Sequence, residues 1–173
     1  MTTFVIEFYD PKEAPYGVFS NYASSPIIID GISYPTVEHY YQAEKFRGPE
    51  ASQRSLDYAT LISKQSTPNK ARIFGLQKTG GGYKWRTDLN AAIIEYQDLT
   101  YRSDWEIVKE EVMHKALLAK FSTNPSLRKI LLDTGNAEIR EHTKRDFYWG
   151  DGYGKGQNRL GTLLMELRDS LHL

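Results

Sequence analysis

The segment 37–46 carries polar side chains whose types and spacing suit acid–base chemistry. Glu38, Tyr41, Gln42 and Lys45 stand at positions i, i+3, i+4 and i+7, so a helix would place them on one face. A carboxylate and a lysine on a helix usually mark a solvated stripe. The opposite stripe, however, mixes charged, small and aromatic residues and offers no clean apolar face. The polar stripe is therefore expected to face inward.

An inward-facing carboxylate and amine suit chemistry at the anomeric carbon of a sugar. Glu38 would activate a water molecule there, or stabilise a transition state that resembles an oxocarbenium ion. Lys45 would supply positive charge. Alternatively, with a pKa lowered by burial, it would attack an open-chain sugar aldehyde and form a Schiff base. The sequence leaves both roles of Lys45 open.

A second candidate site is the segment 149–161, where glycines occupy every second position from 150 to 156 just before a predicted helix. Glycines let backbone N–H groups approach a ligand, and a helix N-terminus favours an anion, so the segment predicts a phosphate site. Lys155 and Arg159 add positive charge. The alternative is a tight structural loop with Asn158 as the N-cap. The pattern matches neither a Walker loop nor a dinucleotide-binding fingerprint.

Metal and thiol chemistry are not indicated. The chain has no cysteine, which excludes disulfides, thiolate zinc sites and a thiol nucleophile. The four histidines are scattered, without a two-histidine zinc spacing: His39, His114, His142 and His172. We expect neither a metal nor a cofactor. Of the basic residues near the glycine-rich middle of the chain, only Arg72 is kept as a candidate substrate contact, because exposed basic side chains are usually just solvated.

Composition predicts one globular domain over residues 1–173. The 22 basic and 22 acidic residues cancel, so overall charge draws the chain neither to duplex DNA nor to an anionic membrane. No signal-like start and no membrane-length apolar run are present, and we expect a cytoplasmic protein. The aromatic share of 13%, with 12 tyrosines, is high. Either a tyrosine-rich surface or a pocket that stacks planar rings accounts for it.

Periodicity and turn residues predict the elements that position these groups. An alternating strand covers 4–9, and Asp30-Gly31 predicts a hairpin turn between strands 27–29 and 32–34. Helices are expected over 35–48, 51–62, 67–75, from 103 onward, over 124–135 and over 160–171, with a loop at 79–86 and a strand at 138–142. The fold class is α+β, mainly α-helical, with a small antiparallel sheet.

Several motifs resemble the YbiA-like, or NADAR, family over nearly the whole chain. The most specific are Phe19-Ser20-Asn21-Tyr22, Tyr34-Pro35-Thr36-Val37-Glu38-His39-Tyr40-Tyr41-Gln42, Lys45-Phe46, Trp149-Gly150-Asp151-Gly152 and Asn158-Arg159-Leu160-Gly161. The resemblance implies a mainly helical fold and N-glycosidase activity. One branch of the family cleaves ribosylamine phosphates of riboflavin synthesis, and another removes ADP-ribose from guanine in nucleic acid. Both branches break a C1′–N bond beside a phosphorylated ribose.

The resemblance also implies the site residues. Glu38, Lys45 and Asp151 are expected to be catalytic. Residues expected to contact the substrate are Phe19, Ser20, Asn21, Tyr22, His39, Tyr41, Gln42, Arg72, Trp149, Gly150, Gly152, Lys155, Gly156 and Asn158. The substrate would be a small phosphorylated riboside or an ADP-ribosylated base, with ADP-ribosylated nucleic acid as a further possible partner.

The chain departs from the shorter family pattern in two places. Leu76 follows Gly75 where an arginine is common, which affects phosphate contacts. The segment 77–101 resembles an insertion that reshapes the base pocket. The main rival to an enzyme is a module that binds ADP-ribose or NAD without turnover. A structural protein that uses its tyrosines for interactions is a third alternative. Glu38 and Lys45 together favour the enzyme, because a module that only binds its ligand needs no acid–base pair.

Overall fold

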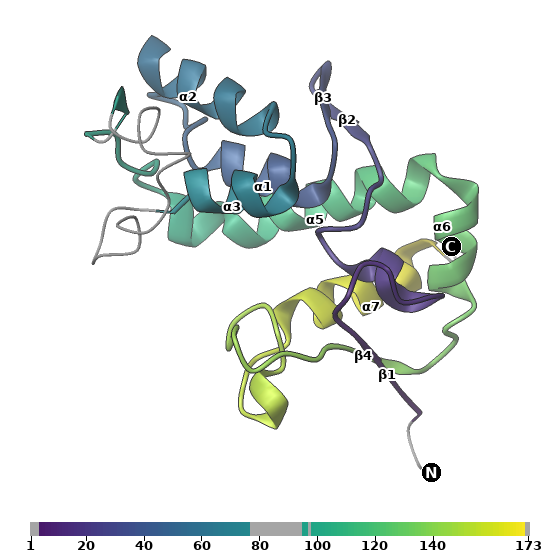
Figure 1. Ribbon diagram of the computed structural model, residues 1–173. Helices are drawn as coiled ribbons and strands as arrows, with labels where there is room; N and C mark the ends of the chain where they lie inside the picture. Colours follow the sequence, from purple (N-terminus) through teal and green to yellow (C-terminus); the bar gives the residue numbers. More distant parts are fainter. Residues whose placement is uncertain (1–3, 77–94, 97, 172–173) are drawn as a thin grey trace. The chain divides into compact units, whose positions relative to one another are not determined.

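The computed structural model describes residues 4–76, 95–96 and 98–171 (Figure 1). Six α-helices lie within these ranges, namely α1 (Val37–Glu44), α2 (Gln53–Ser63), α3 (Pro68–Phe74), α5 (Trp105–Thr123), α6 (Pro125–Leu132) and α7 (Arg159–Leu171). Strands there are β1 (Val5–Phe8), β2 (Ile27–Ile29), β3 (Ile32–Tyr34) and β4 (Glu138–Glu141), and short 3₁₀ turns cover Tyr16–Phe19 and Gly152–Gly154. The predicted mainly helical fold with a small antiparallel sheet is confirmed.

The antiparallel sheet is the predicted hairpin of β2 and β3. Asp30 and Gly31 form its two-residue turn with φ angles of 52° and 77°. Positive φ at both central residues gives the turn a twist that matches the strands, and aspartate and glycine tolerate it best. Ile27 pairs with Tyr34 and Ile29 with Ile32.

Side-chain caps set where three of the helices begin. Thr67 and Asn124 each accept a hydrogen bond from the backbone N–H three residues on, and a proline follows each of them at the first helical position. Ser52 caps α2 in the same way, by accepting from the N–H of Ser55. Helix α2 therefore begins at residue 53, two residues after the predicted start.

Strands β1 and β4 form a second, parallel pair. Val5 aligns with Glu138 and Phe8 with Glu141, so the first strand of the chain pairs with the last. The sequence predicted both strands but not their pairing. Helix α7 packs on β4, and α6 packs on α7.

The chain divides into two compact units. One comprises Met1–Val37 and Met113–Leu173, and the other comprises Glu38–Val112. We call them the terminal unit and the central unit. The prediction of a single domain over 1–173 stays a prediction.

Each unit has its own aromatic cluster. In the terminal unit the ring of Phe19 packs against Phe8 and Phe121, with ring centroids 5.7 and 6.0 Å away. In the central unit the ring of Phe46 packs edge-on against Tyr58, with centroids 4.9 Å apart. Many of the aromatic residues thus belong to cores, a use that neither of the two explanations offered from the sequence had included.

Within the described ranges, no helix is both long enough and apolar enough to cross a membrane. The loop predicted at 79–86 lies outside the described residues. Of the predicted insertion at 77–101, the structure describes only residues 95–96 and 98–101.

Candidate active site

Helix α1 and the residue that follows it bring three of the predicted site residues into one buried region. Glu38, Gln42 and Lys45 expose only 6%, 5% and 8% of their surface, so the polar stripe does turn inward. The Nε2 group of Gln42 donates a hydrogen bond of 2.8 Å to Oε1 of Glu38. This bond holds the carboxylate in one orientation, as a reacting group requires.

The amine of Lys45 lies among three aromatic rings. Its Nζ atom is 4.9 Å from the ring centroid of Tyr101, 5.6 Å from that of Tyr41 and 5.8 Å from that of Trp105. Tyr41 and Trp105 also pack against each other edge to face, with centroids 5.0 Å apart. We call the rings of Tyr41, Tyr101 and Trp105 the aromatic cage. Faces of aromatic rings attract a cation but cannot replace its hydration shell, so the aromatic cage allows both the charged and the neutral form of the amine.

A carbonyl group at the end of α3 fixes the position of this amine. Nζ of Lys45 donates to the oxygen of Gly75 at 3.1 Å, and the Tyr101 hydroxyl donates to the same oxygen at 2.6 Å. Gly75 is the C-cap of α3, where carbonyl groups lack helical partners. Side chains from 101 and 105 and the backbone at 75 therefore complete the environment that α1 begins.

Burial lowers the pKa of Lys45 to about 8. The negative charge of Glu38 opposes this shift, the positive charge of Arg72 adds to it, and the carboxylate of Glu106 opposes it more weakly. With such a pKa, roughly a tenth of the amine is neutral at pH 7. The site therefore holds a carboxylate and an amine that is available as a nucleophile near neutral pH.

Two other predicted substrate contacts, Arg72 and His39, differ from each other in exposure. Arg72 is exposed on α3, where its positive charge lowers the pKa of Lys45, and its contact with a substrate stays a prediction. His39 is buried and its Nε2–H donates to the carbonyl oxygen of Gln65 at 2.9 Å. Burial lowers the pKa of His39, so the neutral ring acts as an anchor between α1 and the turn after α2.

Asp151 lies in the terminal unit, where it organises a loop. It is 4% exposed, and its Oδ1 accepts hydrogen bonds from the backbone N–H groups of Thr143 and Tyr153. Nδ1 of His142 donates to Oδ2 at 2.8 Å. Burial raises the pKa of Asp151, but these hydrogen bonds outweigh it and the pKa falls below its ordinary value. The same ion pair raises the pKa of His142.

The glycine-rich segment uses most of its amide groups internally. The backbone N–H groups of residues 151 and 154–160 all donate to carbonyl oxygens of the loop or of the segment just before it. Asn158 bridges to β4, because its Oδ1 accepts from the N–H of Glu141 and its Nδ2 donates to the oxygen of Ile139. These contacts favour the structural-loop interpretation. A phosphate site here stays a prediction, and exposed Lys155 is its available cation.

Close packing explains two of the glycines. A Cβ atom at Gly156 would lie 2.6 Å from the oxygen of Gly150, and one at Gly152 would lie 2.7 Å from the ring of Phe147. Gly152 also has a φ angle of 53°, which side chains disfavour. Trp149 is partly buried with its ring edge-on to Tyr148, centroids 5.0 Å apart.

The Phe19–Tyr22 segment is also part of the terminal unit. Phe19 is fully buried in the core described above. Lys120 donates from Nζ to the oxygen of Ser20 at 3.0 Å, and the Ser20 hydroxyl accepts from the N–H of Tyr22. Among the described residues, the buried Oδ1 of Asn21 has no hydrogen-bond partner. The side chain of Asn21 is therefore the strongest candidate of the four for a ligand contact.

One cluster has the composition of a metal site. Glu7, His142 and Asp151 bring one ligand atom each to within 4.8 Å of one another. The His142 nitrogen, however, already donates to Asp151, and the Glu7 oxygen is 3.7 Å from that nitrogen. An ion pair accounts for this geometry, and we assign no metal to it.

The structure thus brings Glu38, Gln42, Tyr41 and Lys45 together in the central unit. Asp151 belongs to the terminal unit, and its catalytic role stays a prediction. Sequence reasoning missed Gly75, Tyr101 and Trp105 as neighbours of the amine. No local signal marks them, since they reach Lys45 only through the fold.

Comparison with known proteins identifies the family. A model of the NADAR domain matches residues 7–172. N-glycosidase YbiA of Escherichia coli is 42% identical over 168 residues, which cover 96% of this chain and 88% of that protein. Riboflavin biosynthesis protein PYRR of Zea mays is 35% identical over 98% of this chain and 25% of its own length. The NMR structure of Escherichia coli YbiA superposes with a TM-score of 0.76 at 41% identity, covering 99% of this chain and 87% of that one.

Proposed function

The chain belongs to the NADAR domain family, and we propose that it hydrolyses the C1′–N bond between a phosphorylated ribose, or ADP-ribose, and a nitrogenous base. The relatives named as N-glycosidases support the bond type, and the relative named for riboflavin biosynthesis supports a small ribosylamine phosphate as substrate. The reaction takes place in the cytoplasm, the location that the sequence predicts.

One observation carries the proposal. The amine of Lys45, with a pKa lowered to about 8, is buried just after the helix that carries Glu38, and the charge of the Glu38 carboxylate acts on it. Holding a cation and an anion in a buried site costs free energy unless both are well paired, and here the amine is only partly paired. Shifted pKa values cluster at functional sites, which supports a catalytic role for this pair.

In the first route, Lys45 forms a covalent intermediate. A ribosylamine opens to an imine at C1′, and neutral Nζ adds to that carbon. The C1′–N bond to the base breaks, the base leaves with a proton relayed by Glu38, and the sugar stays on the enzyme as an imine of Lys45. Water then hydrolyses this imine and releases the ribose aldehyde and the free amine.

In the second route, Glu38 acts directly on water. It accepts a proton from a water molecule as that water attacks C1′, and the C1′–N bond breaks through a transition state that resembles an oxocarbenium ion. The Lys45 ammonium protonates the leaving nitrogen or stabilises its negative charge. The two routes share all reactants and products, and differ in whether sugar is ever bonded to Lys45.

The test is a turnover assay with two substrates. We expect the protein to release free ribose phosphate from early ribosylamine intermediates of riboflavin synthesis, or free ADP-ribose from ADP-ribosylated guanine. Glu38→Gln is the inactive variant. The matched control is Glu111→Gln, which makes the same change at an exposed carboxylate on α5. Tight binding of either compound with no product would instead favour the alternative of a module that binds ADP-ribose or NAD without turnover.

A further inference from the structure

The carbonyl oxygen of Gly75 accepts hydrogen bonds from two side chains at once. Nζ of Lys45 donates to it at 3.1 Å, and the hydroxyl of Tyr101 donates to it at 2.6 Å. Gly75 is buried, and its carbonyl group follows the last turn of α3, where carbonyls lack helical partners. A carbonyl oxygen has two lone pairs and can hold both donors. The amine of the imine route therefore shares its acceptor with a hydroxyl group that neither proposed route uses.

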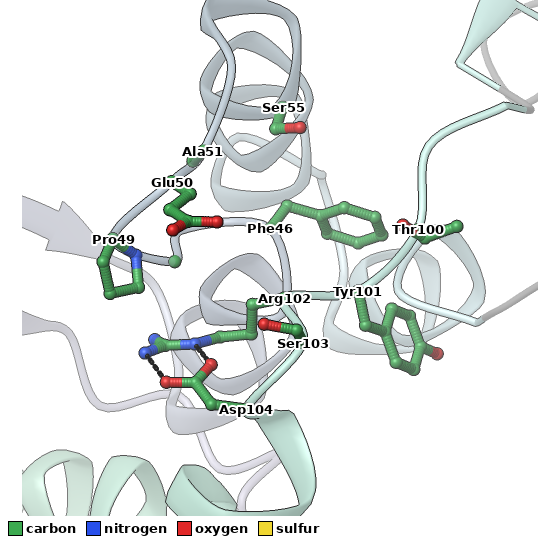
Figure 2. A pocket seen from close by; sticks show the side chains of 11 residues that line it. Phe46, Pro49, Glu50, Ala51, Ser55, Thr100, Tyr101, Arg102, Ser103 and Asp104 are labelled. Carbon is green, nitrogen blue, oxygen red and sulfur yellow. Dashed lines mark hydrogen bonds and ion pairs between the residues drawn. The ribbon is translucent and has the colours of Figure 1, made fainter.

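Contacts of the next residue hold Tyr101 beside the amine. The backbone N–H of Arg102 donates to the oxygen of Lys45 at 2.8 Å, and Nη1 of Arg102 donates to the oxygen of Arg47 at 3.2 Å. Figure 2 shows the side chains of Tyr101 and Arg102 leaving the chain in opposite directions, in the lining of a pocket of about 380 Å³. The Tyr101 hydroxyl thus reaches Gly75 from a segment that is anchored to the residues after α1.

The second donor matters when the amine moves. In the imine route Nζ of Lys45 moves to C1′, becomes double-bonded to it and keeps at most one hydrogen, so it gives up the bond to Gly75. A buried carbonyl group that loses its last donor costs free energy, because water does not replace the donor. The Tyr101 hydroxyl avoids this cost, since it keeps the oxygen paired after the amine has left. Without it, the Gly75 carbonyl would hold Lys45 back.

The shared acceptor also weakens the attraction of Gly75 for the charged amine. Two donors on one oxygen compete for the same negative charge, so the ammonium group of Lys45 gains less than it would from an unshared carbonyl. This effect acts in the same direction as burial, which lowers the pKa of Lys45 to about 8. The charged groups that act on the amine come from three helices, and they are Glu38, Arg72 and Glu106. Removing the Tyr101 hydroxyl changes none of these charges.

We propose that Tyr101 is a positioning residue for the reactive amine, because its hydroxyl keeps the Gly75 carbonyl paired and so lets Lys45 leave that oxygen for a substrate. The role of Tyr101 in turnover rests on the proposed function. Its effect on the free amine does not, since the two donors share the oxygen in the protein without a substrate. Separate measurements therefore test the two effects.

Tyr101→Phe is the test, and Tyr58→Phe is the matched control. Phenylalanine keeps the aromatic ring beside Nζ of Lys45 and removes only the hydroxyl group. The hydroxyl of Tyr58 donates to the carbonyl oxygen of Phe74 at 2.8 Å, one residue before Gly75. The control thus loses the same kind of bond at the same helix end, but leaves the acceptor of the amine untouched.

The first measurement is the pKa of Lys45 in the full chain without substrate, taken from the pH dependence of its Cε resonance in NMR spectra. It should rise by about 0.5–1 pH unit in Tyr101→Phe, the equivalent of one ordinary hydrogen bond, and stay at the wild-type value in Tyr58→Phe. An unchanged or lower pKa in Tyr101→Phe would overturn the proposal. An equal rise in both variants would contradict it too, because it would show a general disturbance of the helix end.

The second measurement is the pH dependence of turnover. In Tyr101→Phe the plateau of kcat/KM should move to higher pH by the same amount, and kcat at pH 7 should fall about three- to tenfold with KM little changed. Tyr58→Phe should keep the wild-type profile. A raised pKa with unchanged kcat would reject the positioning role, since the amine would then leave Gly75 without help. If wild type releases no sugar, the proposed function fails, and the pKa of Lys45 in the two variants still decides whether Tyr101 controls the amine.

Discussion

The ammonium group of Lys45 donates to the carbonyl oxygen of Gly75 at 3.1 Å, which ties the end of α3 to the residue just after α1. Only glycine suits position 75 in this arrangement. A Cβ atom there would lie 2.0 Å from Oε1 of Gln42 and 2.8 Å from its Cβ. Rotation of the Gln42 side chain cannot relieve the second contact, so either the helix end or α1 would have to move.

Gly75→Ala is therefore expected to disturb both stability and catalysis. The added methyl group should lower the free energy of unfolding by about 1–3 kcal/mol, as overpacking of a tight contact does. It should also displace Gln42 from Glu38 and lower kcat. Urea denaturation and steady-state kinetics measure the two effects. A variant as stable and active as wild type would show that the approach of α3 to α1 is looser than described.

Glu38→Gln should remove turnover and leave the fold intact. The amide is nearly isosteric, and its carbonyl oxygen still accepts from Nε2 of Gln42, so the melting temperature should change little. Loss of a general base typically lowers kcat about 10²–10⁴-fold. Kinetics together with circular dichroism test this, with Glu111→Gln as the exposed control. Activity near wild type would remove Glu38 from both proposed routes.

Gly156→Ala and Lys155→Ala distinguish the two interpretations of the glycine-rich loop. A methyl group at 156 meets the oxygen of Gly150 at 2.6 Å and should destabilise the protein by about 1–3 kcal/mol. Lys155 is exposed, and its truncation should change stability by less than about 0.5 kcal/mol. If the loop binds phosphate, Lys155→Ala should still raise KM for a phosphorylated riboside and not for its unphosphorylated analogue. Equal KM changes would leave only the structural role.

Lys120 should make the stability of the terminal unit depend on pH. Burial lowers its pKa to about 7 from an ordinary value of 10.5. Below pH 7 both folded and unfolded states hold the proton, and the full cost of a buried charge is present. Between about 7 and 10.5 only the unfolded state holds it, so folded stability rises with pH.

Lys120→Met provides the measurement, because methionine has a similar length and no charge. The free energy of unfolding of wild type relative to this variant should increase between pH 7 and 9.5, by up to about 1.4 kcal/mol per pH unit. Urea denaturation at several pH values gives this difference directly. Parallel curves for the two proteins would show that Lys120 is hydrated and titrates normally.

Local signals account for the parts of the fold that the sequence predicted. Asp30-Gly31 determines the hairpin turn, and Thr67-Pro68 and Asn124-Pro125 determine where α3 and α6 begin, because each depends on residues within one turn of the chain. The parallel pairing of β1 with β4 depends on strands from opposite ends of the sequence. No periodicity or turn residue records such a pairing.

The candidate site, like the fold, was predictable only where it depends on residues close together in the sequence. Helical spacing alone placed Glu38, Gln42 and Lys45 on one face. The cage around Lys45 could not be predicted, since Tyr101 and Trp105 come from a later segment and Gly75 contributes only a backbone oxygen. For the glycines at 150–156 the sequence left two interpretations open, and the internal hydrogen bonds of the loop favour the structural one, while the phosphate site stays a prediction.

Experiments on Lys45 distinguish the two proposed routes. In the imine route the reactive form of Lys45 is the neutral amine, so kcat/KM should rise with pH and level off near the pKa of about 8. Since the charge of Glu38 raises that pKa, the residual activity of Glu38→Gln should level off at a lower pH. Borohydride added during turnover should reduce the imine, and peptide mapping should locate the sugar on Lys45.

Lys45→Arg is the sharpest variant for this question. Arginine keeps the positive charge and its attraction to the rings of Tyr41, Tyr101 and Trp105, but it cannot form the imine. Under the imine route it should be as inactive as Lys45→Ala, although it binds substrate better. Under the water route it should keep much of the activity and yield no trapped adduct. Substantial turnover in Lys45→Arg would therefore leave the amine as an electrostatic group and make water activation by Glu38 the mechanism.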